Sequence, residues 1–128
     1  MSESVVLDTS AVIALLEEET GAETVRQVLF NAVLSAVTVA ELYTKLSEWE
    51  GRGEKPLLEI LFGVQKVEPF THAQAEAAGR LRAATRSKGL SLGDRCCLAL
   101  AMEMETDVYT ADRAWADLDL ACRIHLIR

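Results

Sequence analysis

The stretch Val5-Val6-Leu7-Asp8-Thr9-Ser10 determines how the rest of this chain is interpreted. Its three apolar residues, two of them β-branched, are typical of a short strand that is buried on both faces. Thr9 and Ser10 can each cap a helix, and the apolar run from Ala11 to Leu16 follows them. The carboxylate of Asp8 is therefore expected where a central strand passes into a helix. Ligands bind outside the carboxyl ends of strands in open parallel sheets, which makes Asp8 a candidate site residue.

The composition favours a single domain over residues 1–128 and a cytoplasmic location. Half of the 128 residues are hydrophobic, and the formal net charge is −7. A general nucleic-acid coat protein would be basic, whereas the acidic metal site of a nuclease itself contributes negative charge. The longest unbroken apolar run, Cys96 to Met102, is far shorter than the ~20 residues that cross a bilayer. The three cysteines form no CxxC pair, which argues against a zinc site or a disulfide framework.

Strand-like and helix-like patterns alternate along the chain. After the first strand, further strands are expected at 33–37, 64–69, 107–110 and 121–127. Helices are expected at 10–17, 22–30, 38–49, 57–62, 71–85 and 92–105. Strands that alternate with helices favour a parallel sheet covered by helices. The predicted fold class is therefore α/β, with three layers, α/β/α, around a central, mostly parallel sheet.

Four acids occupy similar local positions, at strand ends or helix starts: Asp8, Glu41, Asp94 and Asp112. Three of them have a structural explanation when taken singly. Thr38 to Glu41 and Ser91 to Asp94 match the spacing of a capping box, and Asp112 can be a plain N-cap. Asp8 differs, because an unpaired acid at the end of a buried strand is costly.

As a set, these acids predict a metal site. In a parallel sheet, strand ends and the following helix starts lie at one edge, so the four carboxylates should converge there. Carboxylates packed together repel each other, which raises at least one pKa, and a divalent cation removes that conflict. Mg²⁺ and Mn²⁺ prefer such oxygen ligands, and an ion of this kind can activate water and stabilise charge on a phosphate. The set therefore suits phosphodiester hydrolysis without a His or Ser nucleophile.

Four motifs follow one another along the chain: VLDTS at 6–10, VTVAEL at 37–42, LSLGDR at 90–95 with LALA at 98–101, and VYTADRAW at 108–115. In this order they resemble the PIN-domain family, and within it the VapC-type ribonuclease toxins of toxin–antitoxin pairs. The resemblance implies an α/β/α endoribonuclease that depends on Mg²⁺ or Mn²⁺. Asp8, Glu41 and Asp94 match the three core acids of the family, and Asp112 matches the fourth, which is the least constant. The resemblance also implies an RNA substrate, a homodimer and a cognate antitoxin of the VapB type.

Two groups of side chains are expected to assist the acids. One group consists of hydroxyl residues suited to orienting Asp8 or to hydrogen-bonding a metal-bound water, namely Thr9, Ser10 and Thr110. The other group consists of cations that flank the Asp94 turn and are predicted to hold RNA phosphates, namely Arg86, Lys88 and Arg95. Capping and turn roles are the alternative for the hydroxyl residues, and a solvated surface is the alternative for the cations.

Two other functions remain open at this point. Asp8 would serve as the nucleophile in an aspartate-dependent phosphohydrolase. However, Ser10 stands where one such class has a second acid, and Glu3 is the one acid upstream, where another class has a pair. Alternatively, the chain is a non-catalytic module that binds a partner and uses its acids as helix caps. That alternative predicts that Asp8→Asn and Glu41→Gln leave every activity unchanged.

Overall fold

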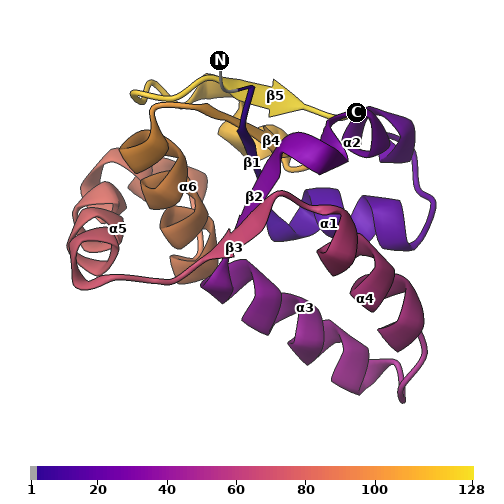
Figure 1. Cartoon of the computed structure of the whole chain (residues 1–128). Coiled ribbons are helices and arrows are strands. Elements are labelled where there is room, and N and C mark those ends of the chain that lie inside the picture. The colour runs from indigo at the N-terminus through magenta and orange to yellow at the C-terminus, as the bar shows by residue number, and fades with distance from the viewer. Residues whose placement is uncertain (1–2) are drawn as a thin grey trace.

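The computed structural model describes residues 3–128 and builds them around a five-stranded parallel sheet (Figure 1). The strands are β1 (Val5–Leu7), β2 (Ala32–Ser35), β3 (Lys66–Glu68), β4 (Asp107–Thr110) and β5 (Ile124–Leu126). They lie in the order β3-β2-β1-β4-β5, and each neighbouring pair runs parallel. The strand that precedes Asp8 is therefore the central one, with two strands on either side of it.

Helices cover both faces of the sheet, which confirms the predicted three-layer α/β/α fold. They are α1 (Thr9–Leu16), α2 (Ala22–Val28), α3 (Ala36–Glu48), α4 (Glu54–Gly63), α5 (His72–Thr85) and α6 (Leu92–Met104). Short 3₁₀ helices follow at Leu29–Asn31, Arg86–Lys88 and Arg113–Asp117. Figure 1 shows α5 and α6 together on one side of the sheet and α1, α2 and α4 on the other, with α3 extending from the end of β2. None of the helices described is long and apolar enough to span a membrane.

The pleat of β1 divides the core into two parts. Val5 and Leu7 pack in one part, with side chains of α1, α2, α3 and α4. Val6 points to the opposite face and packs in the other part, with α5 and with the apolar stretch of α6. All three side chains are at most 8% exposed. A strand that is buried on both faces in this way explains its uninterrupted apolar run.

The first helix begins one residue earlier than the sequence suggests. Asp8 itself is the N-cap of α1, and its Oδ1 accepts a hydrogen bond from the backbone N–H of Ala11 at 2.9 Å. The expectation that Thr9 or Ser10 caps this helix is therefore wrong. An aspartate is as good an N-cap as serine, and the acid at the strand end was already in the right place to act as one.

The helix that carries Glu41 also begins earlier than expected. Its N-cap is Ser35, whose hydroxyl accepts from the backbone N–H of Val37 at 3.0 Å, and α3 starts at Ala36. Glu41 therefore lies in the second turn and forms no capping box with Thr38, contrary to the prediction. The β-branched residues after Ser35 resemble the end of a strand, but a Ser cap started the helix before them.

Other element ends differ by a few residues, in both directions. The strands β3 and β5 are shorter than the predicted 64–69 and 121–127. The helix α4 is longer than the predicted 57–62, and it follows Gly53, which has a left-handed φ of 86°. The predicted helix 22–30 ends at Val28, and the chain continues as a 3₁₀ helix. Both β3 and β5 are edge strands, and each pairs with one neighbouring strand, β2 and β4 respectively.

Candidate functional site

Four acids from four different elements line one cavity at the carboxyl edge of the sheet. Asp8 follows β1, Glu41 comes from α3, Asp94 comes from the first turn of α6, and Asp112 follows β4. The cavity has a volume of about 390 Å³, and its lining consists of Asp8, Thr9, Ser10, Ile13, Glu19, Glu41, Lys45, Asp94, Asp112 and Arg128. The parallel topology thus brings the predicted acids to a common hollow.

Asp8 is held by three neighbours. Its carboxylate accepts hydrogen bonds from the Ala11 N–H at 2.9 Å, from the Ser10 hydroxyl at 2.8 Å and from the Thr110 hydroxyl at 2.6 Å. The two hydroxyls in turn accept backbone N–H groups of the turn after β4, Ser10 from Ala111 at 2.9 Å and Thr110 from Asp112 at 3.0 Å. Ser10 and Thr110 therefore tie the carboxylate at the end of β1 to the backbone that carries Asp112.

Burial makes Asp8 difficult to ionise in the absence of a cation. Its side chain is 3% exposed. The pKa of Asp8 is raised from 3.8 to about 6, mainly by burial and to a smaller extent by the negative charge of Asp94, and this net value includes the opposite effect of the hydrogen bonds from Thr110, Ala11 and Ser10. A carboxyl group in this position gains from a nearby positive charge, because that charge favours its ionised form.

Glu41 is positioned by the hydroxyl of Thr9 on one side and by the space beside Gly93, which has no side chain, on the other. The Thr9 hydroxyl donates a hydrogen bond to Glu41 Oε1. A Cβ atom on Gly93 would clash with Glu41 Oε2 and would lie 2.7 Å from its Cδ. The Glu41 carboxylate therefore rests directly against the first turn of α6, in space that is open because residue 93 is glycine.

Asp94 and Asp112 both have capping roles. Asp94 Oδ2 accepts from the backbone N–H of Ser91 at 2.9 Å, and the Ser91 hydroxyl accepts from the Asp94 N–H at 3.1 Å, which completes the predicted capping box. Asp112 is the N-cap of the 3₁₀ helix that follows it and accepts from the Ala114 N–H at 2.9 Å. An ionised carboxylate has about four lone-pair sites, and each cap uses only part of them. The capping roles of Asp94 and Asp112 therefore leave lone pairs for a cation.

The donor set of the cavity fits a hard divalent cation. Oxygen ligands from carboxylates and hydroxyls are those that Mg²⁺ and Mn²⁺ prefer. Among residues 3–128, however, no three His, Cys, Asp and Glu side chains converge closely enough to form a complete metal site. This arrangement is compatible with Mg²⁺, which keeps several waters and binds through one or two carboxylates.

Comparison with known proteins shows the family. The family model of the PIN domain matches residues 5–120. The chain belongs to the PIN-domain family. No curated protein has significant sequence similarity to this PIN domain.

Solved structures share the fold at low sequence identity. The DNA-bound VapBC complex from Salmonella typhimurium has a TM-score of 0.77 at 18% identity, with both chains fully covered. VapBC-5 from Mycobacterium tuberculosis has a TM-score of 0.67 at 26% identity, with 98% of each chain covered. VapC20 from Mycobacterium tuberculosis, described as a toxin that cleaves the sarcin–ricin loop, has a TM-score of 0.71 at 20% identity, covering 94% of this chain and 99% of that one. The predicted resemblance to VapC-type PIN domains is confirmed.

The cations expected beside the acids lie elsewhere in this PIN domain. The described lining of the acid cavity does not include the three predicted cations, Arg86, Lys88 and Arg95. Arg95 turns toward α5, where its Nη1 donates to the carbonyl oxygen of Ala78 at 2.9 Å. Lys88 forms an ion pair with Asp117 at 3.1 Å. The cations that do line the cavity are Lys45 and Arg128, which the motifs did not single out.

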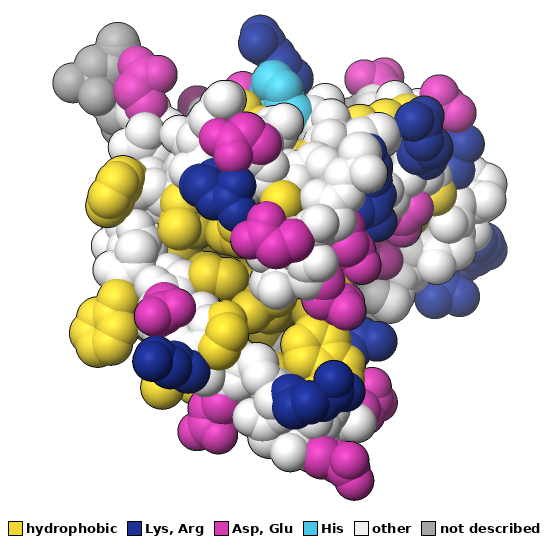
Figure 2. Space-filling view, turned by 90° about the vertical axis from the view of Figure 1, so that its right-hand side faces the viewer, with side chains coloured by type: hydrophobic (Ala, Val, Ile, Leu, Met, Phe, Trp, Pro, Cys, Tyr) yellow, Lys and Arg dark blue, Asp and Glu magenta, His cyan; other side chains and the backbone are white. Residues whose placement is uncertain are grey.

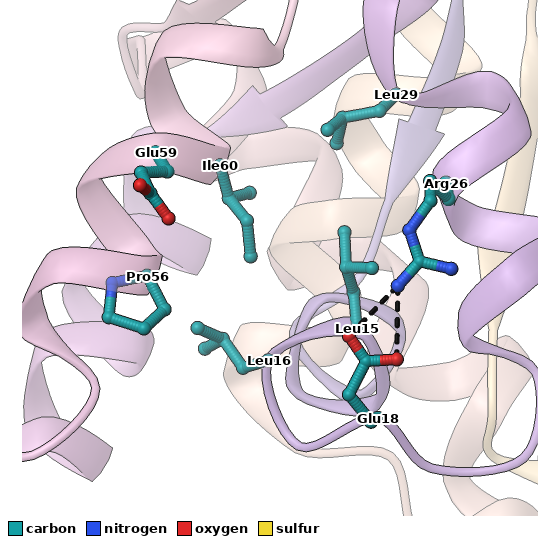
Figure 3. A pocket seen from close by; sticks show the side chains of 8 residues that line it. All are labelled: Leu15, Leu16, Glu18, Arg26, Leu29, Pro56, Glu59 and Ile60. Atoms are coloured by element: carbon teal, nitrogen blue, oxygen red, sulfur yellow. Dashed lines mark hydrogen bonds and ion pairs between the residues drawn. The ribbon is translucent and has the colours of Figure 1, made fainter.

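A second hollow of the PIN domain is largely apolar. It has a volume of about 360 Å³ and is lined by Leu15, Leu16, Glu18, Arg26, Leu29, Pro56, Glu59 and Ile60, from α1, α2, α4 and the segments next to them. Figure 2 shows apolar side chains gathered in a hollow of this face, with charged side chains around it. In Figure 3 the leucines and Ile60 point into the space between the helices, and Arg26 at the rim pairs with Glu18, at 2.9 Å.

Proposed function

We propose that this PIN domain is a divalent-metal-dependent endoribonuclease, with Mg²⁺ or Mn²⁺ as its cofactor, and the toxin of a toxin–antitoxin pair. The observation that carries the proposal is the cavity that Asp8, Glu41, Asp94 and Asp112 line together. Membership of the PIN family supports a nuclease. The described activity of the structural neighbour VapC20 supports RNA as the substrate.

The four acids have the catalytic, metal-holding role in this proposal, and the hydroxyl residues position them. When bound, a divalent cation lowers the pKa of water and neutralises charge on a phosphoryl group under attack. Ser10 and Thr110 keep the Asp8 carboxylate aimed at the cavity. Thr9 does the same for Glu41. Side chains fixed in this way do not have to reorganise when a substrate arrives.

The contacts of Asp8 and Glu41 argue against the two alternatives. An aspartate nucleophile must bring one oxygen within bonding distance of a phosphorus atom, for which the 3% exposed side chain of Asp8 leaves little room, whereas a metal ion needs only a lone pair on an oxygen that also accepts a hydrogen bond. A binding module with acids as caps accounts for Asp94 and Asp112, but it gives Glu41 no role. Glu41 lies beyond the first turn of α3, and Thr9 holds it over Gly93, at the cavity.

Cleavage of total RNA by the purified protein tests the nuclease. We expect cleavage with Mg²⁺ or Mn²⁺, and none after addition of EDTA. Asp8→Asn and Asp94→Asn should both abolish cleavage with the fold intact. The matched control is Asp119→Asn, because that acid is exposed and lies outside the cavity lining. Cleavage that persists in EDTA or in both site variants would refute the proposal.

The antitoxin partner in this proposal occupies the apolar hollow between α1, α2 and α4. The hollow offers leucine and isoleucine side chains to an apolar segment, and Arg26 and Glu59 offer charges at its rim. Structural neighbours that are VapBC toxin–antitoxin complexes support a VapB-like partner. Leu16→Asp should weaken antitoxin binding and leave RNA cleavage unchanged. Unchanged antitoxin binding would show that the antitoxin does not occupy this hollow. The expected homodimer and the expected cytoplasmic location remain predictions.

A further inference from the structure

The acid cavity needs positive charge from the protein before RNA can bind across it. Its lining includes the four site acids and also Glu19, and the chain as a whole carries a charge of −7. One divalent cation leaves such a cavity negative. The phosphates of an RNA strand next to the one being cleaved are therefore repelled, unless cationic side chains lie beside the acids.

Lys45 supplies one such charge on α3. It is four residues after Glu41 and so lies one turn further along the same face of the helix. Within the described part of the chain, its ammonium group pairs loosely with Glu48 Oε1, at 4.0 Å, and its side chain is 52% exposed. Lys45 also lines an adjoining hollow of about 230 Å³, together with Thr9, Glu41, Thr44 and Glu48. The concave surface therefore continues from the acids along α3, and Lys45 borders both parts of it.

Arg128 supplies a second charge from another direction. It follows β5, whereas α3 follows β2, and these two strands lie on opposite sides of β1 in the sheet. Its Nη1 donates to Glu19 Oε1 at 3.1 Å and to the carbonyl oxygen of Thr20 at 3.0 Å. The side chain is 36% exposed. A guanidinium group has five N–H donors in a rigid fork, so these two contacts fix its position and leave donors for a phosphate.

We infer that Lys45 and Arg128 hold the RNA phosphates on the two sides of the scissile bond. The strand then runs from α3, across the acids, to the end of β5. Within residues 3–128, these two are the cations that line the acid cavity. They are positioning residues and take no part in the chemical step. The inference rests on the proposed ribonuclease function and replaces the surface of Arg86, Lys88 and Arg95 as the phosphate-binding site.

Binding of a short single-stranded RNA to the inactive Asp94→Asn protein tests the inference. Fluorescence anisotropy with a labelled oligoribonucleotide gives Kd at several salt concentrations. Each phosphate contact on a single strand contributes about 0.7 to the slope of log Kd against log salt, and such binding does not require the cognate sequence. In this background we expect Lys45→Ala and Arg128→Ala each to reduce the slope by about that amount, and Lys45→Arg to retain it. The matched control is Arg80→Ala, on α5, whose side chain is 77% exposed and pairs with Glu76.

The outcomes separate this inference from the proposed function. In the active protein, Lys45→Ala should raise KM for RNA cleavage with kcat almost unchanged. If the wild type cleaves RNA but both alanine variants keep the original Kd and slope, the inference is overturned and the ribonuclease stands. The same holds if Arg86→Ala and Lys88→Ala reduce the slope instead, or if the two variants weaken only the antitoxin complex. If the folded wild type does not cleave RNA and the inactive protein does not bind it, both proposals fail.

Discussion

Burial of Asp8 should make the metal-free protein lose stability as the pH rises. The pKa of Asp8 in the folded protein is about 6, mainly because of burial, against an ordinary value of 3.8. The folded state therefore binds more protons than the unfolded state between these two values, and the free energy of unfolding falls as the pH rises through that range. One pKa unit corresponds to about 1.4 kcal/mol, so the ionised carboxylate costs the metal-free protein on the order of 3 kcal/mol at neutral pH.

Asp8→Asn removes this ionisation and should therefore stabilise the metal-free protein at pH 7.5. The gain should approach about 3 kcal/mol, less any loss from weaker hydrogen bonds to Ser10 and Thr110, and the pH-dependent part should fall to about 0.5 kcal/mol at pH 4. Urea unfolding of both proteins in EDTA, at several pH values between 4 and 8, measures the difference. Other titrating groups cancel in this comparison. A difference that stays constant, or that shifts in favour of the wild type as the pH rises, would show that burial does not raise the pKa of Asp8.

Three further predictions concern the same cavity. In Gly93→Ala, the new Cβ forces the Glu41 carboxylate to move by about 1 Å. This shift should lower kcat/KM for RNA cleavage by on the order of 10²-fold, while thermal unfolding shows no loss of stability. Full activity of the variant would contradict the prediction. Ser91→Ala removes the N-cap of α6 and should cost about 1 kcal/mol in urea unfolding, a cost that is absent if the cap contributes nothing. Mn²⁺ affinity should decrease as the pH falls below about 6, because Asp8 takes up a proton, and a titration with the same affinity at pH 5 and pH 7.5 would exclude this coupling.

Most of the fold could be predicted, because alternating hydrophobic patterns carry that information locally. The central strand Val5–Leu7 is apolar throughout, and its residues do pack on both faces. The errors lie at element ends, where one polar side chain decides the outcome. Ser35 is the N-cap of α3, so the β-branched residues that resemble a strand lie inside this helix. Asp8, and not Thr9 or Ser10, is the N-cap of α1.

The candidate site was predictable to the extent that its residues sit next to strand ends. Asp8, Asp94 and Asp112 follow or begin elements whose ends meet at one edge of a parallel sheet, and all three line the cavity. Lys45 was detectable from its helical spacing to Glu41. Arg128 was not, because its place depends on the strand order of the sheet, which brings the end of β5 beside Glu19. Arg95 follows Asp94 in sequence but does not line the cavity, because its side chain turns toward α5, and its predicted role in RNA binding stays a prediction.

Titration of Mn²⁺ into the metal-free protein at pH 7.5 tests most directly whether the acids are ligands as well as helix caps. If the account is correct, calorimetry of the wild type shows binding, and Asp8→Asn, Glu41→Gln and Asp94→Asn each weaken it at least about tenfold, while Asp119→Asn does not. If the acids only cap helices and form local hydrogen bonds, the wild type binds no Mn²⁺. Absence of binding by the folded wild type would contradict the account.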